Sequence, residues 1–582
     1  MSLRIALKPI LKGDFSMKRA SRFVAWLVVL LLTSLACTEA QALSFSAHGY
    51  YRLFVDWSLD LDTQTPSNIA QGKQLGNDRF GQILFGQQRL RIDPILKIND
   101  NLTIQGQVDI LDDVLFGTND VEQLTVFNPI TGTIDLPGGP GAFGVTGPAA
   151  GDIVTGGGGS LNVRRLWVDI LTPIGKFRIG RQPSNWGLGI FQNDGNGMYA
   201  KFGDTFDRFL YLGKYDFADS SSLAFAFLAD FVFNDQEDPT IGLLESNIGT
   251  ISNGTYQLTA ALIYQRDTWE IGTYTGVRLR DGTGKREGTA LDANGNEVPG
   301  AIDGNTRAFY FDLYGKYEKG PYRIAAEYVF LGGTIGTGVC INAISVPAGF
   351  SNPLPNPACL DGSNDLRVHM GALEASGKYD FGGEWKFIAG LATGDSSPLS
   401  SRITQFGFRP DYEVALMLFH MPLGTSPAIQ VNGETKLGNL PITSNRVNNA
   451  VYLGGTYLHQ FDISNTIPQA QYFKMGAHFL TAWAPSRVFD IDFAEITGIP
   501  TLPRVVNDSH WYGFETDLIF EAKFFEHLIW NVTGGVFIPG GVFNIKNDDF
   551  ANSVLNGNPI NAIQFDKASP AYAVRSTLFI EF

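Results

Sequence analysis

The chain of 582 residues is poor in charge and rich in aromatic side chains: 17% of it is Asp, Glu, Lys or Arg, 12% is Phe, Trp or Tyr, and its formal net charge is −15. A soluble protein normally carries roughly 25% charged residues, so the deficit favours a surface that partly faces lipid. The acidic total argues against nucleic-acid binding, which needs a basic face.

The N-terminus has the pattern of a secretory signal peptide. Basic residues at 18, 19 and 22 precede an apolar stretch, and the small-residue site Ala40-Gln41-Ala42 follows. We therefore expect residues 1–42 to be removed, with Met17 as the true start, and residues 43–582 to form one domain. Cys37 sits in a faint lipoprotein context, but the simpler interpretation is that it leaves with the signal.

The apolar stretch is too short to cross a bilayer of ~30 Å, and no run of about 20 apolar residues follows it. This excludes a helical membrane protein. Segment 44–58 instead alternates apolar and polar side chains, with Phe45, Leu53 and Trp57 on one face and Arg52 and Asp56 on the other. Charges at alternate positions of an apolar strand need a wet interior on one side and lipid on the other.

The same rhythm of long strand, short turn, long strand and long loop continues to the C-terminus. It predicts an all-β fold, a single transmembrane antiparallel β-barrel of about 18 strands, within a range of about 16 to 20. Short turns on the periplasmic side and long loops outside would place both termini in the periplasm. The apolar run Tyr412 to Phe419 fits either an added strand or a loop folded into the mouth. The strands are expected at 44–58, 81–97, 101–116, 161–171, 176–183, 206–216, 221–233, 254–265, 268–280, 305–318, 321–332, 365–380, 383–393, 447–461, 471–484, 511–524, 527–538 and 570–582.

The sequence ends on Phe582, with Ile580, Leu578 and Val574 on the same face of the last strand. Porin-like barrels commonly end on such an aromatic strand, which the insertion machinery reads, so Phe582 is by analogy the expected assembly signal. Alternation alone would also fit a soluble β-solenoid or sandwich. Neither of these explains the terminal phenylalanine together with a signal peptide.

Cys340 and Cys359 are the cysteines left after signal removal, and they lie in a Pro/Gly/Asn-rich stretch between two strand patterns. We expect a disulfide between them, which a chain-entropy model values at about 3 kcal/mol. A metal site would need neighbouring His or further Cys at ligand spacing, and the stretch offers neither.

The sequence does not indicate an enzyme. No G-x-S-x-G, H-E-x-x-H or C-x-x-C motif occurs, and the seven histidines are scattered. His48, His369, His459 and His478 are expected to be structural, although some outer-membrane enzymes carry a catalytic His near the rim. No cofactor is expected. The acidic turn 292–297 resembles a calcium loop only loosely, so Ca²⁺ at an outer loop stays an open alternative to an ordinary turn.

The mature chain resembles Gram-negative porins at the level of pattern. Three strings, IGRQPSNWGLGIF at 179–191, GLATGD at 390–395 and FRPDYEVALMLF at 408–419, resemble the alginate-export-type barrels, several of which are eighteen-stranded. The acidic net charge departs from what an exporter of a polyanion would carry, which puts alginate itself in doubt.

The interior is where selectivity would reside, because rings of charged side chains set which solutes pass. Early strands are rich in arginine and late strands in acidic residues, as in general porins whose opposed walls create a transverse field. Structural ion pairs that fill the interior are the equal alternative. The residues on the polar phase are Arg52, Arg89, Arg91, Arg165, Arg178, Arg278, Asp93, Asp109, Asp169, Glu270, Asp312, Glu327, Glu515 and Asp517.

Residues 184–205 form the third outer loop and compare with the loop that folds inside general porins. Its glycines would let the backbone bend tightly against the wall. Asp194 and Asp204 would then face Arg89, Arg91, Arg165 and Arg178 across a constriction, and neutralising the arginines would shift ion selectivity toward cations. A plainly exposed loop is the alternative.

These patterns predict a passive outer-membrane channel for small hydrophilic solutes or ions. A TonB-dependent transporter would need about 22 strands and a plug, whereas the first strand here starts directly after the signal. The alternative is a structural or adhesive surface barrel that acts through its long loops. Expected partners are outer-membrane lipids, lipopolysaccharide and the barrel assembly machinery. A homotrimer and the identity of the solute are left open.

Overall fold

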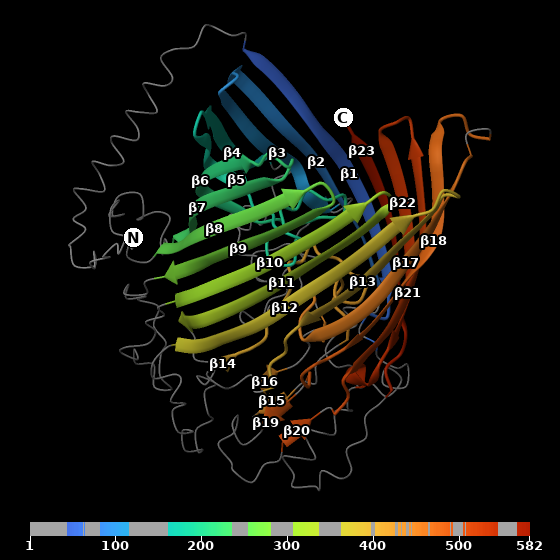
Figure 1. The fold of residues 1–582 in the computed structure, drawn as a ribbon. Helices are drawn as coiled ribbons and strands as arrows, with labels where there is room; N and C mark the ends of the chain where they lie inside the picture. The colour runs from blue at the N-terminus through green and yellow to red at the C-terminus, as the bar shows by residue number, and fades with distance from the viewer. Residues whose placement is uncertain are drawn as a thin grey trace.

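The chain forms a closed antiparallel β-barrel in a computed structural model (Figure 1). The structure describes residues 43–61, 63, 82–115, 161–234, 254–280, 306–336, 363–396, 402–424, 429–431, 434–437, 442–443, 445–463, 466–488, 490–492, 504–506, 508–544 and 567–582. The expected signal peptide 1–42, the Cys340–Cys359 pair and the acidic turn 292–297 lie outside these residues. Among the described residues, no helix is long and apolar enough to cross a membrane.

Eighteen long strands among the described residues make the barrel wall. They are β1 (Ser44–Leu59), β2 (Gln82–Asn99), β3 (Leu102–Leu115), β4 (Leu161–Thr172), β5 (Gly175–Pro183), β6 (Thr205–Asp216), β7 (Ser222–Asn234), β8 (Gly254–Arg266), β9 (Trp269–Arg280), β10 (Thr306–Lys319), β11 (Tyr322–Gly336), β12 (Ser363–Lys378), β13 (Gly383–Ala392), β17 (Ala450–Phe461), β18 (Ala470–Trp483), β21 (Trp511–Phe524), β22 (Leu528–Pro539) and β23 (Ala571–Glu581). Each of these eighteen strands pairs with the next one named, and β1 closes the barrel by pairing with β23, from Tyr50↔Glu581 to Leu59↔Tyr572. The predicted barrel of about 18 strands is confirmed, and every expected strand overlaps an observed one.

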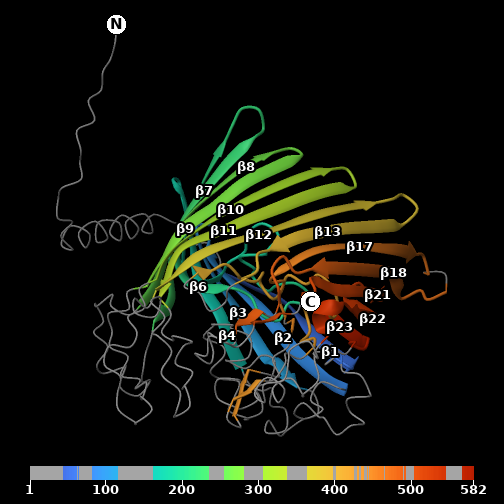
Figure 2. The same cartoon turned by 90° about the horizontal axis from the view of Figure 1, so that it is seen from below.

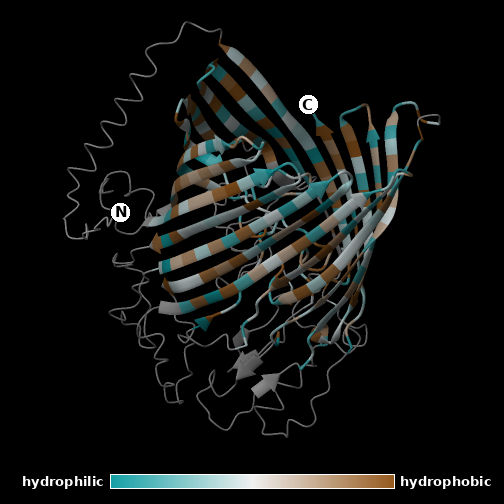
Figure 3. Cartoon of the chain, viewed as in Figure 1, coloured by the Kyte–Doolittle hydropathy of each residue, from teal (hydrophilic) through white to brown (hydrophobic). Residues whose placement is uncertain are grey.

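The wall has an apolar outer face and a buried inner face because successive side chains of a strand point to opposite sides. On β10, Phe309, Phe311 and Leu313 are exposed on the outside, whereas Tyr310 and Asp312 are buried inside. The hydropathy colouring shows the resulting stripes along the tilted strands (Figure 3).

The two ends of the barrel differ. Short turns such as 173–174 and 320–321 lie at the end where β1 begins and β23 finishes, which we call the short-turn end. The opposite, loop end carries the small elements β14 (Arg402–Ile403), β15 (Ile429–Val431), β16 (Glu434–Leu437), β19 (Asp490–Asp492), β20 (Arg504–Val506) and the 3₁₀ turn η4 (Gly541–Phe543). β14 pairs in parallel with the first residues of β12.

Two connections turn back from the loop end into the barrel. We call residues 184–204 the first inner segment and residues 404–424 the second inner segment. In the view from below they appear as irregular teal and orange traces among the strands (Figure 2). The run Tyr412 to Phe419 belongs to the second inner segment and is not a barrel strand.

The second inner segment builds an apolar core inside the barrel. Leu416, Met417 and Leu418 are buried in one cluster with inward-facing residues of the late strands, such as Tyr452 on β17 and Phe537 on β22. Buried apolar surface stabilises by roughly 25 cal/mol per Å², so this packing fixes the segment against the wall. Near the loop end, the side of the interior formed by the late strands is therefore largely apolar.

Candidate functional site: the charged interior

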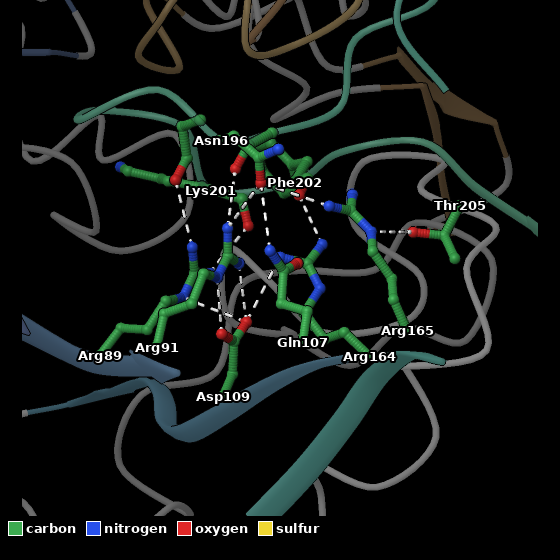
Figure 4. Close-up of polar contacts among 12 residues, drawn as sticks. Arg89, Arg91, Gln107, Asp109, Arg164, Arg165, Asn196, Lys201, Phe202 and Thr205 are labelled. Carbon is green, nitrogen blue, oxygen red and sulfur yellow. Dashed lines mark hydrogen bonds and ion pairs between the residues drawn. The ribbon is translucent and has the colours of Figure 1, made fainter. Parts of the chain in front are cut away.

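A basic wall holds the first inner segment by its carbonyl oxygens. It consists of Arg52 on β1, Arg89 and Arg91 on β2, and Arg164 and Arg165 on β4. Figure 4 shows the side chains of Arg89, Arg91, Arg164 and Arg165 pointing toward the part of the first inner segment that carries Asn196, Lys201 and Phe202. Arg89 donates to the carbonyls of Ala200 at 3.2 Å and Lys201 at 3.0 Å. The other carbonyls that accept from this wall belong to Asp194, Gly195, Met198, Phe202 and Asp204.

Asp109 on β3 compensates the charge of the basic wall. Arg91 makes a two-pronged ion pair with it, with both N···O distances 2.7 Å, and Arg89 and Arg164 approach it to 3.7 and 3.4 Å. Asp109 and Arg91 are almost completely buried. A buried carboxylate among guanidinium groups is stabilising only with such paired geometry, because desolvation of each ion costs several kcal/mol.

A β-bulge places two consecutive arginines in the interior. The register between β3 and β4 shifts at Gln107 and Val108. Gln107 pairs with Arg165 and Val108 pairs with Val163, so Arg164 is the extra residue on β4. A bulge of this kind lets neighbouring side chains point to the same face. Strict alternation assigned only Arg165 to the polar face, so Arg164 was missed, and no local signal in the sequence marks the bulge.

Acidic residues of the later strands hold both inner segments by their backbone amide groups. We call Glu327 on β11 and Glu515 on β21 the acidic wall. Glu327 on β11 accepts from the backbone N–H groups of Leu188 and Gly189 in the first inner segment. Glu515 on β21 accepts from Met417 at 2.7 Å and from Leu418 at 2.6 Å in the second. The opposed basic and acidic walls therefore match the two poles of the peptide group, carbonyl oxygen and amide hydrogen.

The two inner segments also bind each other. Asp411 accepts hydrogen bonds from the backbone N–H groups of Lys201 (2.8 Å) and Phe202 (3.1 Å), and Arg409 forms a 2.6 Å ion pair with Asp204. Burial raises the pKa of both carboxyl groups above the ordinary value, although Arg409 opposes this at Asp204. The segments thus form one connected unit that spans from the basic to the acidic wall.

A second cluster joins the second inner segment to the closing strands. Arg575 on β23 forms a two-pronged ion pair with Asp56 on β1, at 2.7 and 3.0 Å, and approaches His420 Nε2 at 2.8 Å. His420 Nδ1 lies 3.2 Å from Glu413. Burial raises the pKa of Glu413 to about 7, and burial beside Arg575 holds the pKa of His420 well below its usual value.

Three further arginines, Arg278, Arg409 and Arg446, form a group around Arg409 and are partly exposed. Arg409, with 29% of its side chain exposed, lies within electrostatic range of Arg278 on β9 and of Arg446. Arg278 donates to the neutral side chain of Gln257, at 2.7 and 3.1 Å. Among the described residues, Asp204 is the carboxylate at hydrogen-bond distance from Arg409, so three guanidinium groups gather at this partly exposed point.

Toward the short-turn end, inward-facing ion pairs remain in contact with water. Arg178 pairs with Asp169 at 2.6 Å, with 21% and 13% of the side chains exposed. Lys316 pairs with Glu270 at 3.4 Å, with 26% and 20% exposed. Glu374 and Glu384 continue this wet ring of ion pairs through partners on β11, β13 and β18.

The predicted constriction residues therefore occupy four different environments. Arg89, Arg91 and Arg165 lie together in the basic wall, whereas Arg178 lies apart from them, in the wet ring. The side chain of Asp194 accepts hydrogen bonds from Asn196 within its own turn. Asp204 pairs with Arg409, which the sequence reasoning did not single out. No group of His, Cys, Asp and Glu among the described residues is arranged to hold a metal ion.

No family model matches the chain, and no curated protein matches its sequence. Several solved structures resemble it over most of its length. The anion-selective porin from Comamonas acidovorans shares 9% identity over 93% of this chain and 100% of its own, with a TM-score of 0.37. OccK11 (OpdR) of Pseudomonas aeruginosa shares 8% over 92% and 96%, with a TM-score of 0.41. The outer membrane channel DcaP of Acinetobacter baumannii shares 9% over 94% and 99%, with a TM-score of 0.34.

Proposed function

We propose that the protein is a passive, water-filled outer-membrane channel for small hydrophilic solutes or ions. The observation that carries the proposal is the wet ring: charged side chains on the inner face keep contact with water inside a wall whose outer face is apolar. A closed barrel is the β-structure that satisfies every backbone group in a membrane, because it has no open edge. The short turns and the long connections support the orientation with both termini in the periplasm.

The inner segments narrow the passage and set its charge. The basic wall is buried and its guanidinium groups bind protein oxygens, so these arginines position the first inner segment rather than meet the solute. Arg278, Arg409 and Arg446 keep partial exposure, and Arg278 and Arg446 lie within electrostatic range of Arg409, so positive charge is concentrated there. A field of this sign at a narrow, water-accessible point attracts anions. We therefore assign anion preference to this group.

The test is ion selectivity in planar bilayers with a salt gradient. Replacing Arg278 and Arg409 by Gln should move the reversal potential toward cation selectivity, while Arg89→Gln should alter stability more than selectivity. Arg181→Gln, on the outer face of β5 and paired with Asp207, is the matched control and should leave the reversal potential unchanged. The change is expected to be modest, because salt at 0.1 M screens charges beyond ~10 Å. An unchanged reversal potential in a folded, conducting double variant would reject the assignment of anion preference.

One observation favours the alternative of a structural or adhesive barrel. The apolar core around Leu416, Met417 and Leu418 fills part of the interior at the loop end. If the purified protein gives neither conductance in bilayers nor solute uptake in liposomes, this core closes the barrel and the channel proposal fails.

A further inference from the structure

The outer face of the barrel changes character along one row of paired residues near the loop end. On β7, β8 and β9 the row consists of Phe231, Tyr256 and Leu279, of which Phe231 and Leu279 are well exposed. On the next strands the same row continues with Arg307, Thr334, Asp365 and Arg402. The apolar belt is thus interrupted over β10 to β14.

Strand tilt explains where this change falls. Strands of a closed barrel tilt by roughly 35–45° to its axis, so a row of hydrogen-bonded neighbours slants relative to the membrane plane. From β7 to β14 the row therefore moves from the apolar belt to the polar surface beyond its edge. Below the polar part, Phe309, Phe311 and Tyr328 are exposed on β10 and β11 at 40–45%. The polar part lies at the edge of the apolar surface, which is the level of lipid headgroups.

The polar part of the row carries a net positive charge. Arg367 Nε lies 3.0 Å from Asp365, and Arg402 Nε lies 3.5 Å from the same carboxylate oxygen. Both arginines are more than half exposed, at 61% and 58% of their side chains. Arg307 is exposed on β10, the strand next to Thr334, and its side chain makes no hydrogen bond or ion pair with another described residue. Arg367 and Arg402 thus share the Asp365 carboxylate, and Arg307 adds a third guanidinium group to a surface that faces away from the interior.

We propose that Arg307, Arg367 and Arg402 bind the phosphate groups of the phosphorylated glycolipid that surrounds the barrel in the outer leaflet, lipopolysaccharide. Guanidinium groups match phosphate oxygens in two-pronged geometry. Acyl chains of the same lipid would pack on Phe309, Phe311 and Tyr328, so one molecule engages both surfaces. The inference rests on the proposed outer-membrane location and orientation, and it is independent of conduction.

The experiment measures lipid binding to the full protein, purified from membranes in detergent, by native mass spectrometry. The probe is diphosphorylated lipid A, and the same lipid with its phosphates removed is the reference. A basic residue near an anionic lipid contributes about 1 kcal/mol, so Arg307→Gln should weaken binding about fivefold and the triple Gln variant about 100-fold. Asp365→Asn should strengthen binding, because it removes a carboxylate that competes with the phosphate for Arg367 and Arg402.

The matched control is Arg181→Gln, because Arg181 is an exposed outward arginine that is already paired with Asp207, at 2.8 Å. It should bind like the native protein. Equal binding of the native protein to lipid A with and without phosphates, or native-like binding by the triple variant, would overturn the proposal. Equal binding of phosphatidylglycerol, or displacement by inorganic phosphate at the lipid concentration, would overturn it as well. Folded protein is verified by heat-modifiable mobility, and unchanged conductance of the triple variant separates this site from the channel.

Discussion

At the scale of single residues, Asp109 shows how much a buried charge depends on its partners. Arg91 pairs with it directly, and Arg89 and Arg164 lie within 3.7 Å. Removing one partner of a buried ion pair leaves a desolvated charge uncompensated, whereas an exposed pair contributes little. The basic wall is therefore more sensitive to loss of this carboxylate than to most other single changes.

Asp109→Asn is expected to lower the free energy of unfolding by ~3 kcal/mol, the usual cost of breaking a buried pair. Denaturant unfolding in lipid vesicles, followed by tryptophan fluorescence, measures it. The exposed pair Arg181–Asp207 provides the comparison, since Arg181→Gln should cost about 1 kcal/mol or less. Losses of equal size in the two variants would contradict the account of the buried pair.

At the scale of elements, the inner segments have little regular structure of their own and depend on the wall and on each other. The left-handed backbone of Gly187, with φ +58°, brings it so close to Glu327 that a Cβ atom would meet Glu327 Oε2 at 2.5 Å. Only glycine allows this approach without strain. The segment therefore reaches the acidic wall because a glycine stands at this turn.

Asp411→Ala is expected to loosen the first inner segment, because it removes the acceptor of the Lys201 and Phe202 amide groups. Hydrogen bonds to a charged group contribute roughly 1.5–3 kcal/mol, so opening should become about 30-fold more frequent. Trypsin cleavage after Lys201 and open-channel current noise both report this opening. Asp219→Ala, in a short turn where Asp219 binds Ser221, is the control and should change neither.

At the scale of the whole molecule, the closure between β1 and β23 joins residues more than 500 positions apart. Gly49 and Phe582 exchange backbone hydrogen bonds of 2.9 and 3.0 Å at the short-turn end. The side chain of Phe582 is 54% exposed and therefore adds little packing energy to the folded barrel. This fits a role during insertion better than a role in stability.

Phe582→Ser is consequently expected to reduce the amount of folded barrel in the membrane several-fold, while the purified folded variant unfolds close to the native temperature. Heat-modifiable mobility of membrane fractions measures the first quantity, and thermal unfolding in detergent measures the second. Tyr572→Ser, near the other end of β23, is the control for a general weakening of the last strand. A normal amount of folded Phe582→Ser protein in the membrane would contradict the hypothesis that Phe582 is an assembly signal.

The sequence by itself determined the strands and their faces. Alternation is a local property with a period of two, so segments such as 44–58 and 305–318 revealed both the wall and which side chains point inward. It also placed Arg52, Arg89 and Arg91 correctly on the inner face. The short strand β5 was also predicted, at 176–183, from the rhythm of strands and short turns.

Only the tertiary structure decided what these inward side chains meet. Alternation fixes a face but not the group across the interior, and here that group is the backbone of a segment about 100 residues away from Arg89 and Arg91. The bulge that turns Arg164 inward depends on register with β3, and the fate of Tyr412 to Phe419 depends on apolar side chains of β17 and β22. Such contacts form when the barrel closes, because closure is what brings distant strands and loops into one interior.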